Sequence, residues 1–106
     1  MTKKNFKHNR GIQNNVSKKN PLITIITVVF NNKKFLEKTI KSVLGQNYQN
    51  IEYIIIDGGS TDGTLNIIKK YNKRINFWVS ENDKGIYDAF NKGLKHATGD
   101  LIGFVN

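Results

Sequence analysis

Four apolar runs alternate with amphipathic segments along residues 21–106. The runs cover residues 22–30, 51–56, 75–80 and 101–105, and their isoleucine, valine and aromatic content is typical of buried strands. Between them, apolar residues recur at the spacing of a helix that has one buried face. The predicted order is therefore βαβαβαβ, an α/β fold in which a Rossmann-like parallel sheet has helices on both faces.

Each predicted helix has one apolar face that we expect to pack on the sheet. Gly45 is suited to cap the first helix and Gly99 to stop the third. The expected inward residues are Phe35, Leu36, Ile40, Val43 and Leu44 in the first helix, Leu65, Ile68 and Tyr71 in the second, and Ile86, Phe90, Leu94 and Ala97 in the third.

The second strand breaks abruptly into residues 57–64, Asp-Gly-Gly-Ser-Thr-Asp-Gly-Thr. The glycines allow a tight turn or a close approach to a ligand, and the hydroxyl and acidic residues suit a helix N-terminus. Strand–turn–helix units of a parallel sheet bind ligands beyond the carboxyl ends of their strands. Asp57 therefore lies where chemistry is expected, with Asn31-Asn32 and residues 81–84 at the same rim. The first and last strands should be neighbours, which places a crevice near Asn31 and Asn106.

Several classes of site are excluded by the motifs. No Gly-x-Gly-x-x-Gly dinucleotide fingerprint or P-loop is present, and the residues around Ser60 do not form Gly-x-Ser-x-Gly. His8 and His96 cannot form a credible metal set, and His96 suits a helix end. The chain has no cysteine, which excludes disulfides and thiolate metal sites.

The net charge of +9 lies mostly in residues 1–20, which hold six basic side chains and no acid. This polar segment is expected to be a disordered basic tail, either a solvated extension or a weak tether to anionic lipid or nucleic acid. Residues 21–106 carry only a small excess of positive charge, so a nucleic-acid-binding function is disfavoured. No apolar run approaches the ~20 residues of a membrane helix, and no signal peptide is evident. We expect a cytoplasmic protein, with the inner face of the cell membrane as an alternative location.

Taken together, the segments resemble the family 2 glycosyltransferases, which have the GT-A nucleotide-diphospho-sugar fold. The Asp-Gly-Gly-Ser and Asp-Lys-Gly-Ile-Tyr-Asp-Ala variants are similar to a branch associated with bacterial surface-polysaccharide assembly. The matching segments follow in collinear order: Ile-Ile-Thr-Val-Val-Phe-Asn at 25–31, Ser-Val-Leu-Gly-Gln at 42–46, Ile-Asp-Gly-Gly-Ser-Thr-Asp-Gly-Thr at 56–64, Trp-Val-Ser-Glu at 78–81, Asp-Lys-Gly-Ile-Tyr-Asp-Ala at 83–89, Asn-Lys-Gly at 91–93, Ala-Thr-Gly-Asp at 97–100 and Ile-Gly-Phe-Val-Asn at 102–106.

The resemblance implies a donor-nucleotide site. The end of the first strand would hold the base, Asp57 would contact base or ribose, and Lys84 would face the nucleotide. Structural alternatives stay open: Phe30 as core, Asp57 as a turn cap, Lys84 as a solvated charge and Asn91 as a structural bridge. Asp62 and Asp88 are expected to be caps near helix starts. The implied nucleotide-binding residues are Val28, Phe30 (stacked on uracil), Asn31, Asp57, Lys84 and Asn91.

Two departures from the family pattern matter. Many relatives carry a second consecutive acid, which reads the base, where this chain has Gly58. The family's motif for Mg²⁺ or Mn²⁺ would follow immediately after Asn106, so neither a metal site nor a catalytic residue is assigned. Residues 21–106 are thus expected to be the nucleotide-sugar-binding half of a GT-A domain, truncated before its metal motif.

The expected function is transfer of a sugar from a nucleotide donor, most simply a UDP-sugar, to a hydroxyl of a glycan or lipid-linked acceptor. This chain would be the donor-binding part and inactive alone, with peripheral membrane association as a further expectation. The alternative is a non-catalytic nucleotide-binding or interaction module from a split or decayed gene. Apolar surface left uncovered beside the fourth strand predicts self-association.

Overall fold

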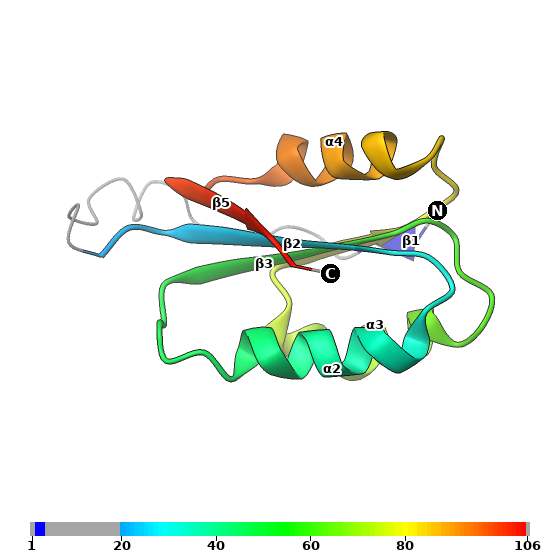
Figure 1. Ribbon diagram of the computed structural model, residues 1–106, viewed down its shortest axis with the longest axis horizontal. Coiled ribbons are helices and arrows are strands. Elements are labelled where there is room, and N and C mark those ends of the chain that lie inside the picture. Colours follow the sequence, from blue (N-terminus) through cyan, green and yellow to red (C-terminus); the bar gives the residue numbers. More distant parts are fainter. Residues whose placement is uncertain (1, 4–19, 106) are drawn as a thin grey trace.

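The computed structural model describes residues 2–3 and 20–105. They form a single sheet with helices on its two faces (Figure 1). The elements in chain order are β1 (Thr2–Lys3), β2 (Ile23–Val29), α2 (Lys33–Leu44), β3 (Ile51–Asp57), α3 (Thr64–Lys70), a 3₁₀ turn η1 (Asn72–Arg74), β4 (Phe77–Ser80), α4 (Ile86–His96) and β5 (Leu101–Phe104).

The strands lie in the order β1-β4-β3-β2-β5. β2 pairs in parallel with β3 on one side and with β5 on the other, and β3 pairs in parallel with β4. The predicted parallel α/β sheet is confirmed, and so is the prediction that the first and last strands of 21–106 are neighbours. Because β5 lies beside β2 rather than beyond β4, the strand order reverses next to β2.

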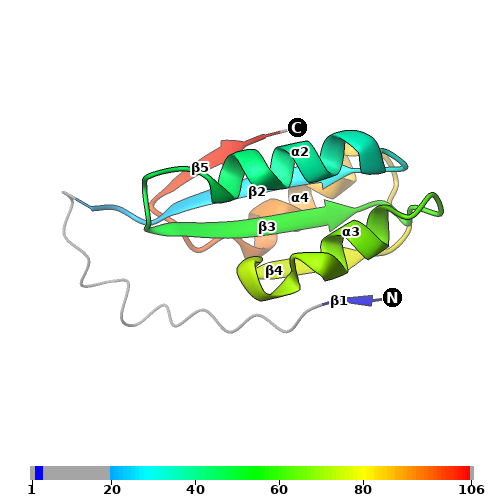
Figure 2. The same cartoon turned by 90° about the horizontal axis from the view of Figure 1, so that it is seen from below.

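The helices α2 and α3 cover one face of the sheet and α4 covers the other, as two views at right angles show (Figures 1 and 2). The central strand β3 is therefore buried on both faces, with Ile54, Ile55 and Ile56 at 0% exposure. This explains why β3 reads as an uninterrupted apolar run instead of alternating. Tyr53 also lies inside, where its hydroxyl pairs with that of Thr27 at 2.9 Å and burial raises the pKa of the phenol to about 12.

The predicted inward face of the third helix is wrong in part. Ala89 and Gly93 are the buried residues of α4, whereas Ile86 and Leu94 are exposed. A Cβ at position 93 would come within 2.7 Å of the Ile26 side chain, so α4 turns its smallest residues to the sheet and approaches β2 closely. Phe90 stays half-buried, edge-on to the ring of Phe104 on β5. In the same way, Phe35 of α2 was expected inward and is exposed.

A buried carboxylate joins the start of β5 to the middle of the sheet. Glu52 is fully buried and accepts hydrogen bonds from the Thr24 hydroxyl at 2.7 Å and from the Thr98 backbone N–H and hydroxyl at 2.8 and 2.6 Å. Gly99 donates its N–H to the Thr24 hydroxyl oxygen at 2.9 Å. The Asp100 backbone N–H donates to the Leu22 carbonyl at 2.7 Å. We call Glu52, Thr24, Thr98 and Gly99 the amino-end clasp.

The expected disordered tail differs from the structure at its first described residues. Thr2–Lys3 form a short antiparallel strand against β4, opposite Ser80 and Val79. Residues 4–19, and with them most of the predicted tail, lie outside the described residues. Within the described part of the chain, no helix has the length and apolar character needed to cross a membrane.

Candidate nucleotide site

The turn after β3 is held by Asp57, whose side chain is fully buried. Its Oδ2 atom accepts from the Ser60 backbone N–H at 3.1 Å and from the Ser80 hydroxyl at 2.6 Å, and its Oδ1 accepts from the Ser60 hydroxyl. The carboxylate thus ties the turn to the end of β4. Of the two interpretations of Asp57, its geometry matches the turn cap.

Asn31 ties the end of β2 to the same turn. Its backbone is in the left-handed region, with φ of 47°. Its N–H donates to the Ser60 hydroxyl oxygen at 2.7 Å, and its side-chain oxygen accepts from the Thr61 N–H at 2.7 Å. The two polar loops at this rim are therefore locked together before any ligand binds.

Asp62 and Asp88 are caps near helix starts, as expected. Asp62 Oδ1 accepts from the Thr64 hydroxyl and N–H, and Oδ2 accepts from the Lys33 N–H at 3.3 Å. These bonds hold the pKa of Asp62 below its ordinary value, and the bond from the Thr64 hydroxyl contributes most. Asp88 accepts the Lys84 N–H at 2.9 Å, and this bond chiefly lowers the pKa of Asp88.

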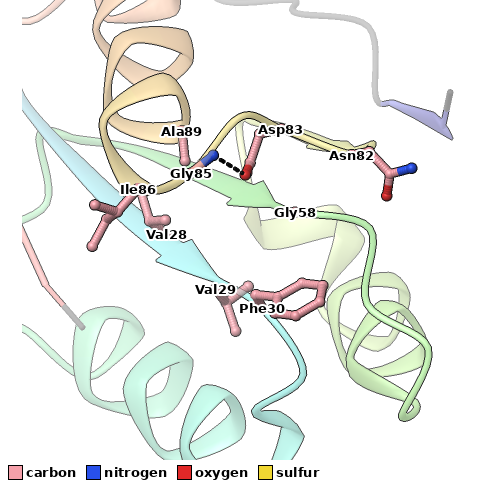
Figure 3. Close-up of a pocket in the computed structure, with 9 residues that line it drawn as sticks. All are labelled: Val28, Val29, Phe30, Gly58, Asn82, Asp83, Gly85, Ile86 and Ala89. Carbon is pink, nitrogen blue, oxygen red and sulfur yellow. Dashed lines mark hydrogen bonds between the residues drawn. The ribbon is translucent and has the colours of Figure 1, made fainter.

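A cavity of about 530 Å³ opens at the carboxyl ends of β2 and β3. The crevice was predicted near Asn31 and Asn106, but Asn31 does not line this cavity, and Asn106 lies outside the described residues. Figure 3 shows that the walls of the cavity come from the end of β2, the turn at Gly58, the loop before α4 and the first turn of α4. Phe30 is 61% exposed and lines this cavity, so it is not a core residue. The lining residues are Val28, Val29, Phe30, Gly58, Asn82, Asp83, Gly85, Ile86 and Ala89.

Asp83 alone among these lining residues carries a charge. Its Oδ1 accepts the Gly85 N–H at 3.1 Å (Figure 3), and Gly85 has a φ of 108° that favours glycine. Its Oδ2 lies over Gly58: a Cβ at position 58 would be 2.9 Å from that oxygen and 3.4 Å from Cδ1 of Phe30. The carboxylate thus takes the space that a side chain at position 58 would fill.

The cavity includes only part of the predicted site. Val28 and Phe30 line it, whereas Asn31, Asp57, Lys84 and Asn91 do not. Lys84 and Asn91 are exposed, on the loop before α4 and on α4 itself. Sequence reasoning placed Asn82 and Asp83 at this rim without assigning them a role, and it missed Ile86 and Ala89. The available signal for Asp83 was the Asp-x-Gly spacing of 83–85, in which an aspartate accepts the backbone N–H two residues on.

The described residues do not fit a divalent cation. Residues 2–3 and 20–105 contain no group of three or more histidine, aspartate or glutamate side chains that could hold a metal ion. Asp57, at the end of β3, already uses both oxygens within the protein. Asn106, immediately after which the family's metal motif was expected, lies outside the described residues.

Comparison with known proteins gives a family match over most of the chain. The model of glycosyl transferase family 2 matches residues 24–106. An uncharacterized glycosyltransferase of Mycobacterium tuberculosis is 42% identical over 87 residues, which are 81% of this chain and 33% of that protein. The putative teichuronic acid biosynthesis glycosyltransferase TuaG of Bacillus subtilis is 38% identical, over 81% of this chain and 35% of the relative. The chain thus spans about a third of the length of these relatives.

Solved structures share the fold. The mannosyltransferase PcManGT from Pyrobaculum calidifontis, in complex with GDP-Man and Mn²⁺, superposes with a TM-score of 0.72 at 27% identity, over 77% of this chain and 26% of that chain. S. aureus TarS 1–349 in complex with UDP-GlcNAc superposes with a TM-score of 0.71 at 28% identity, over 79% of this chain and 26% of that chain. The described sheet and helices are therefore similar to part of a GT-A glycosyltransferase.

Proposed function

This chain belongs to glycosyl transferase family 2, and we propose that it is the donor-nucleotide-binding part of an enzyme that transfers a sugar from a nucleoside diphosphate to a hydroxyl acceptor. The observation that carries the proposal is the cavity at the carboxyl ends of β2 and β3, which has an exposed aromatic residue, one carboxylate and one side-chain amide among mainly apolar walls. Its volume lies within the range of small-molecule sites.

The cavity has the chemistry that a nucleotide base requires. A base is a flat ring with polar edges, and it stacks on an aromatic face such as that of Phe30. Val28, Ile86 and Ala89 supply apolar wall, while Asp83 and Asn82 supply polar groups for the edge of the base. The bonds of Asn31 and Asp57 to Ser60 hold the surrounding loops in place, so little ordering cost should accompany binding.

The donor that we propose is a UDP-sugar, and the acceptor a hydroxyl of a glycan or lipid-linked glycan. The similarity to TarS, solved with UDP-GlcNAc, supports a uridine nucleotide. The similarity to PcManGT, solved with GDP-Man, makes a guanosine nucleotide the alternative donor. The likeness to a putative teichuronic acid biosynthesis enzyme supports a polysaccharide product. A cytoplasmic location, with or without contact to the inner face of the membrane, belongs to the same proposal.

The chain's own residues bind and orient the donor in this proposal and do not complete the chemistry. A divalent ion, where such an enzyme holds one, stabilises the charge of the diphosphate leaving group. The described residues offer no fit for such an ion and no candidate for the general base that the acceptor hydroxyl needs. We therefore propose that residues 1–106 alone bind the donor without turning it over.

Calorimetric titration of the chain with UDP and UDP-GlcNAc, with and without Mn²⁺, tests the proposal. Phe30→Ala should weaken binding roughly tenfold because the base loses its stacking partner. Phe35→Ala is the matched control, since Phe35 is 57% exposed and does not line the cavity. Absence of binding to any nucleoside diphosphate would overturn the proposal and favour a non-catalytic interaction module.

Self-association is a separate part of the proposal. β5 is an edge strand of the described sheet, and Leu101, Ile102 and Phe104 are 56%, 45% and 47% exposed. Apolar side chains on an unpaired strand edge favour association between copies. Light scattering over a concentration series should show an average mass that rises above 12.1 kDa. A constant monomer mass would contradict it.

A further inference from the structure

We propose that Asp83 selects the base of the nucleotide, its carboxylate accepting the ring N3–H of uracil. The inference rests on the proposed function, because it needs a nucleotide in the cavity beside Phe30. It adds a residue to which neither the family match nor the relatives' descriptions give a role, together with a chemical rule for which bases the cavity accepts.

One carboxylate oxygen of Asp83 already accepts a hydrogen bond within the protein. Oδ1 accepts the N–H of Gly85 at 3.1 Å, which fixes the side chain in a turn at the start of α4. The carboxyl group is half-buried, so it is held by the protein and not fully hydrated. An acceptor that is fixed before binding loses little entropy when the ligand arrives.

The other carboxylate oxygen of Asp83, Oδ2, lies over Gly58. A Cβ at position 58 would be 2.9 Å from Asp83 Oδ2 and 3.4 Å from the Phe30 ring, so Gly58 lies between the two side chains. Figure 3 shows Phe30 and Asp83 coming to Gly58 from different elements, the end of β2 and the loop before α4. A flat ring stacked on Phe30 would therefore turn its edge toward Oδ2.

Chemical selection between bases follows from the hydrogen-bonding groups on their edges. An ionised carboxylate only accepts hydrogen bonds, so it favours a base edge that donates. The edge of uracil carries one ring N–H, whereas cytosine has a lone pair at the same ring position. Guanine presents two adjacent N–H donors, which would suit a carboxylate with both oxygens free. With Oδ1 bonded to Gly85, one free oxygen matches one donor, and uracil fits best.

A carboxylate would repel the carbonyl oxygens on each side of that uracil N–H. Asn82 is the other polar side chain among the described lining residues, but Figure 3 draws it apart from the Asp83 carboxylate, and its Oδ1 lies at Gly59. The bond from the ring N–H to Oδ2 would therefore have to outweigh this repulsion, and the affinity of UDP relative to a base without that N–H measures the net effect.

The experiment compares UDP with N3-methyluridine diphosphate, which lacks the ring N–H, by calorimetry on the unmodified chain. We expect UDP to bind roughly tenfold or more tightly, the effect of removing a hydrogen bond to a charged group. In Asp83→Ala, UDP should fall to the affinity of the methylated probe. Asp88→Ala is the matched control, since Asp88 bonds to Lys84 and does not line the cavity.

The outcomes separate this inference from the proposed function. If UDP and its methylated form bind equally to the unmodified chain, or Asp83→Ala keeps the preference, the role of Asp83 is overturned while nucleotide binding stands. If GDP binds more tightly than UDP and loses this advantage in Asp83→Ala, the choice of uracil is overturned. If no nucleotide binds, the proposed function fails and this inference fails with it.

Discussion

Two carboxylates at opposite ends of the parallel sheet have opposite surroundings. Glu52, near the start of β3, is fully buried and accepts three hydrogen bonds from Thr24 and Thr98. Asp83, beyond the carboxyl ends of β3 and β4, is half-buried and accepts one hydrogen bond from Gly85 with Oδ1, while Oδ2 faces the cavity beside Phe30. The two acids are similar chemically and differ in how completely the protein uses them.

This difference distinguishes a structural acid from a binding acid. A buried carboxylate is tolerated only when hydrogen bonds replace its water, and the amino-end clasp supplies them to Glu52. Asp83 lines the cavity, and its Oδ2 lies against Gly58. Substitution at the first acid should therefore change the free energy of unfolding, and substitution at the second should change ligand affinity.

The largest effect is expected for Glu52→Ala. The substitution leaves the Thr98 N–H and the hydroxyls around it without their buried acceptor, which should lower the free energy of unfolding by about 3 kcal/mol. Urea denaturation measures it. Glu52→Gln keeps one acceptor oxygen and should cost about 1 kcal/mol. If the Glu52→Ala chain were as stable as the unmodified one, Glu52 would not be a structural acid.

Asp57 ends β3, and its substitution tests whether it stabilises the fold, as Glu52 does, or serves mainly in binding, as we propose for Asp83. Because it is fully buried and bonded to Ser60 and Ser80, Asp57→Ala should destabilise the fold by about 2 kcal/mol. Asp83→Ala should stay within about 0.5 kcal/mol of the unmodified chain. Thermal unfolding of both variants decides the question. Equal stability losses would mean that Asp83 is structural as well.

Two glycines extend the comparison to backbone packing. A Cβ at Gly99 would meet backbone atoms of Thr24 and Leu22 at 2.7 and 2.9 Å, so Gly99→Ala forces the amino-end clasp apart and should cost about 1.5 kcal/mol. A Cβ at Gly58 would instead meet the end of the Asp83 side chain, which can move. Gly58→Ala should therefore fold almost normally, as urea denaturation would show, and weaken UDP binding. The reverse ranking of stabilities would contradict this view of the two ends.

The fold was predictable from sequence because its signals are local and repeated. The uninterrupted run of β3 and the turn chemistry after Asp57 specify a doubly covered parallel strand and a helix start without any knowledge of distant contacts. The face of α4 was not predictable in the same way. Periodicity selected Ile86 and Leu94, but the close approach to Ile26 selects the smallest residues, Ala89 and Gly93.

The sequence predicted a cavity at the carboxyl ends of the strands, but it placed the crevice between the first and last strands and identified only some of the lining residues. Parallel topology placed it at the strand ends, and Val28 and Phe30 line it. The sequence marked Asp57 as the acid of the site because Asp57 directly follows a strand. Which acid faces the cavity depends on whether Ser60 and Ser80 bond to Asp57, and on the space that Gly58 leaves for Asp83. Both are tertiary facts with no periodic signal.

The smallest effect is expected at Asp62, whose hydrogen bonds to Thr64 and Lys33 lower its pKa in the folded chain from the ordinary value of 3.8. A lowered folded pKa means that the stabilisation is complete above the unfolded pKa and is lost as the pH falls through the folded pKa. Asp62→Asn removes this contribution. The melting temperatures of the two chains should therefore differ slightly and constantly between pH 7 and 5, and should converge below about pH 4.

Convergence of the two melting temperatures at low pH would assign the stability difference to the charge of Asp62 and not to other acidic groups. Asp88, whose pKa is also lowered, is present in both chains and cancels in the difference between them. Melting curves at pH 7, 5, 4 and 3 are sufficient. A difference that persists unchanged at pH 3 would mean that the Asp62 carboxylate does not stabilise the start of α3 by its charge. Asp62 would then stabilise the start of α3 by a contact that does not depend on its charge and that asparagine does not reproduce.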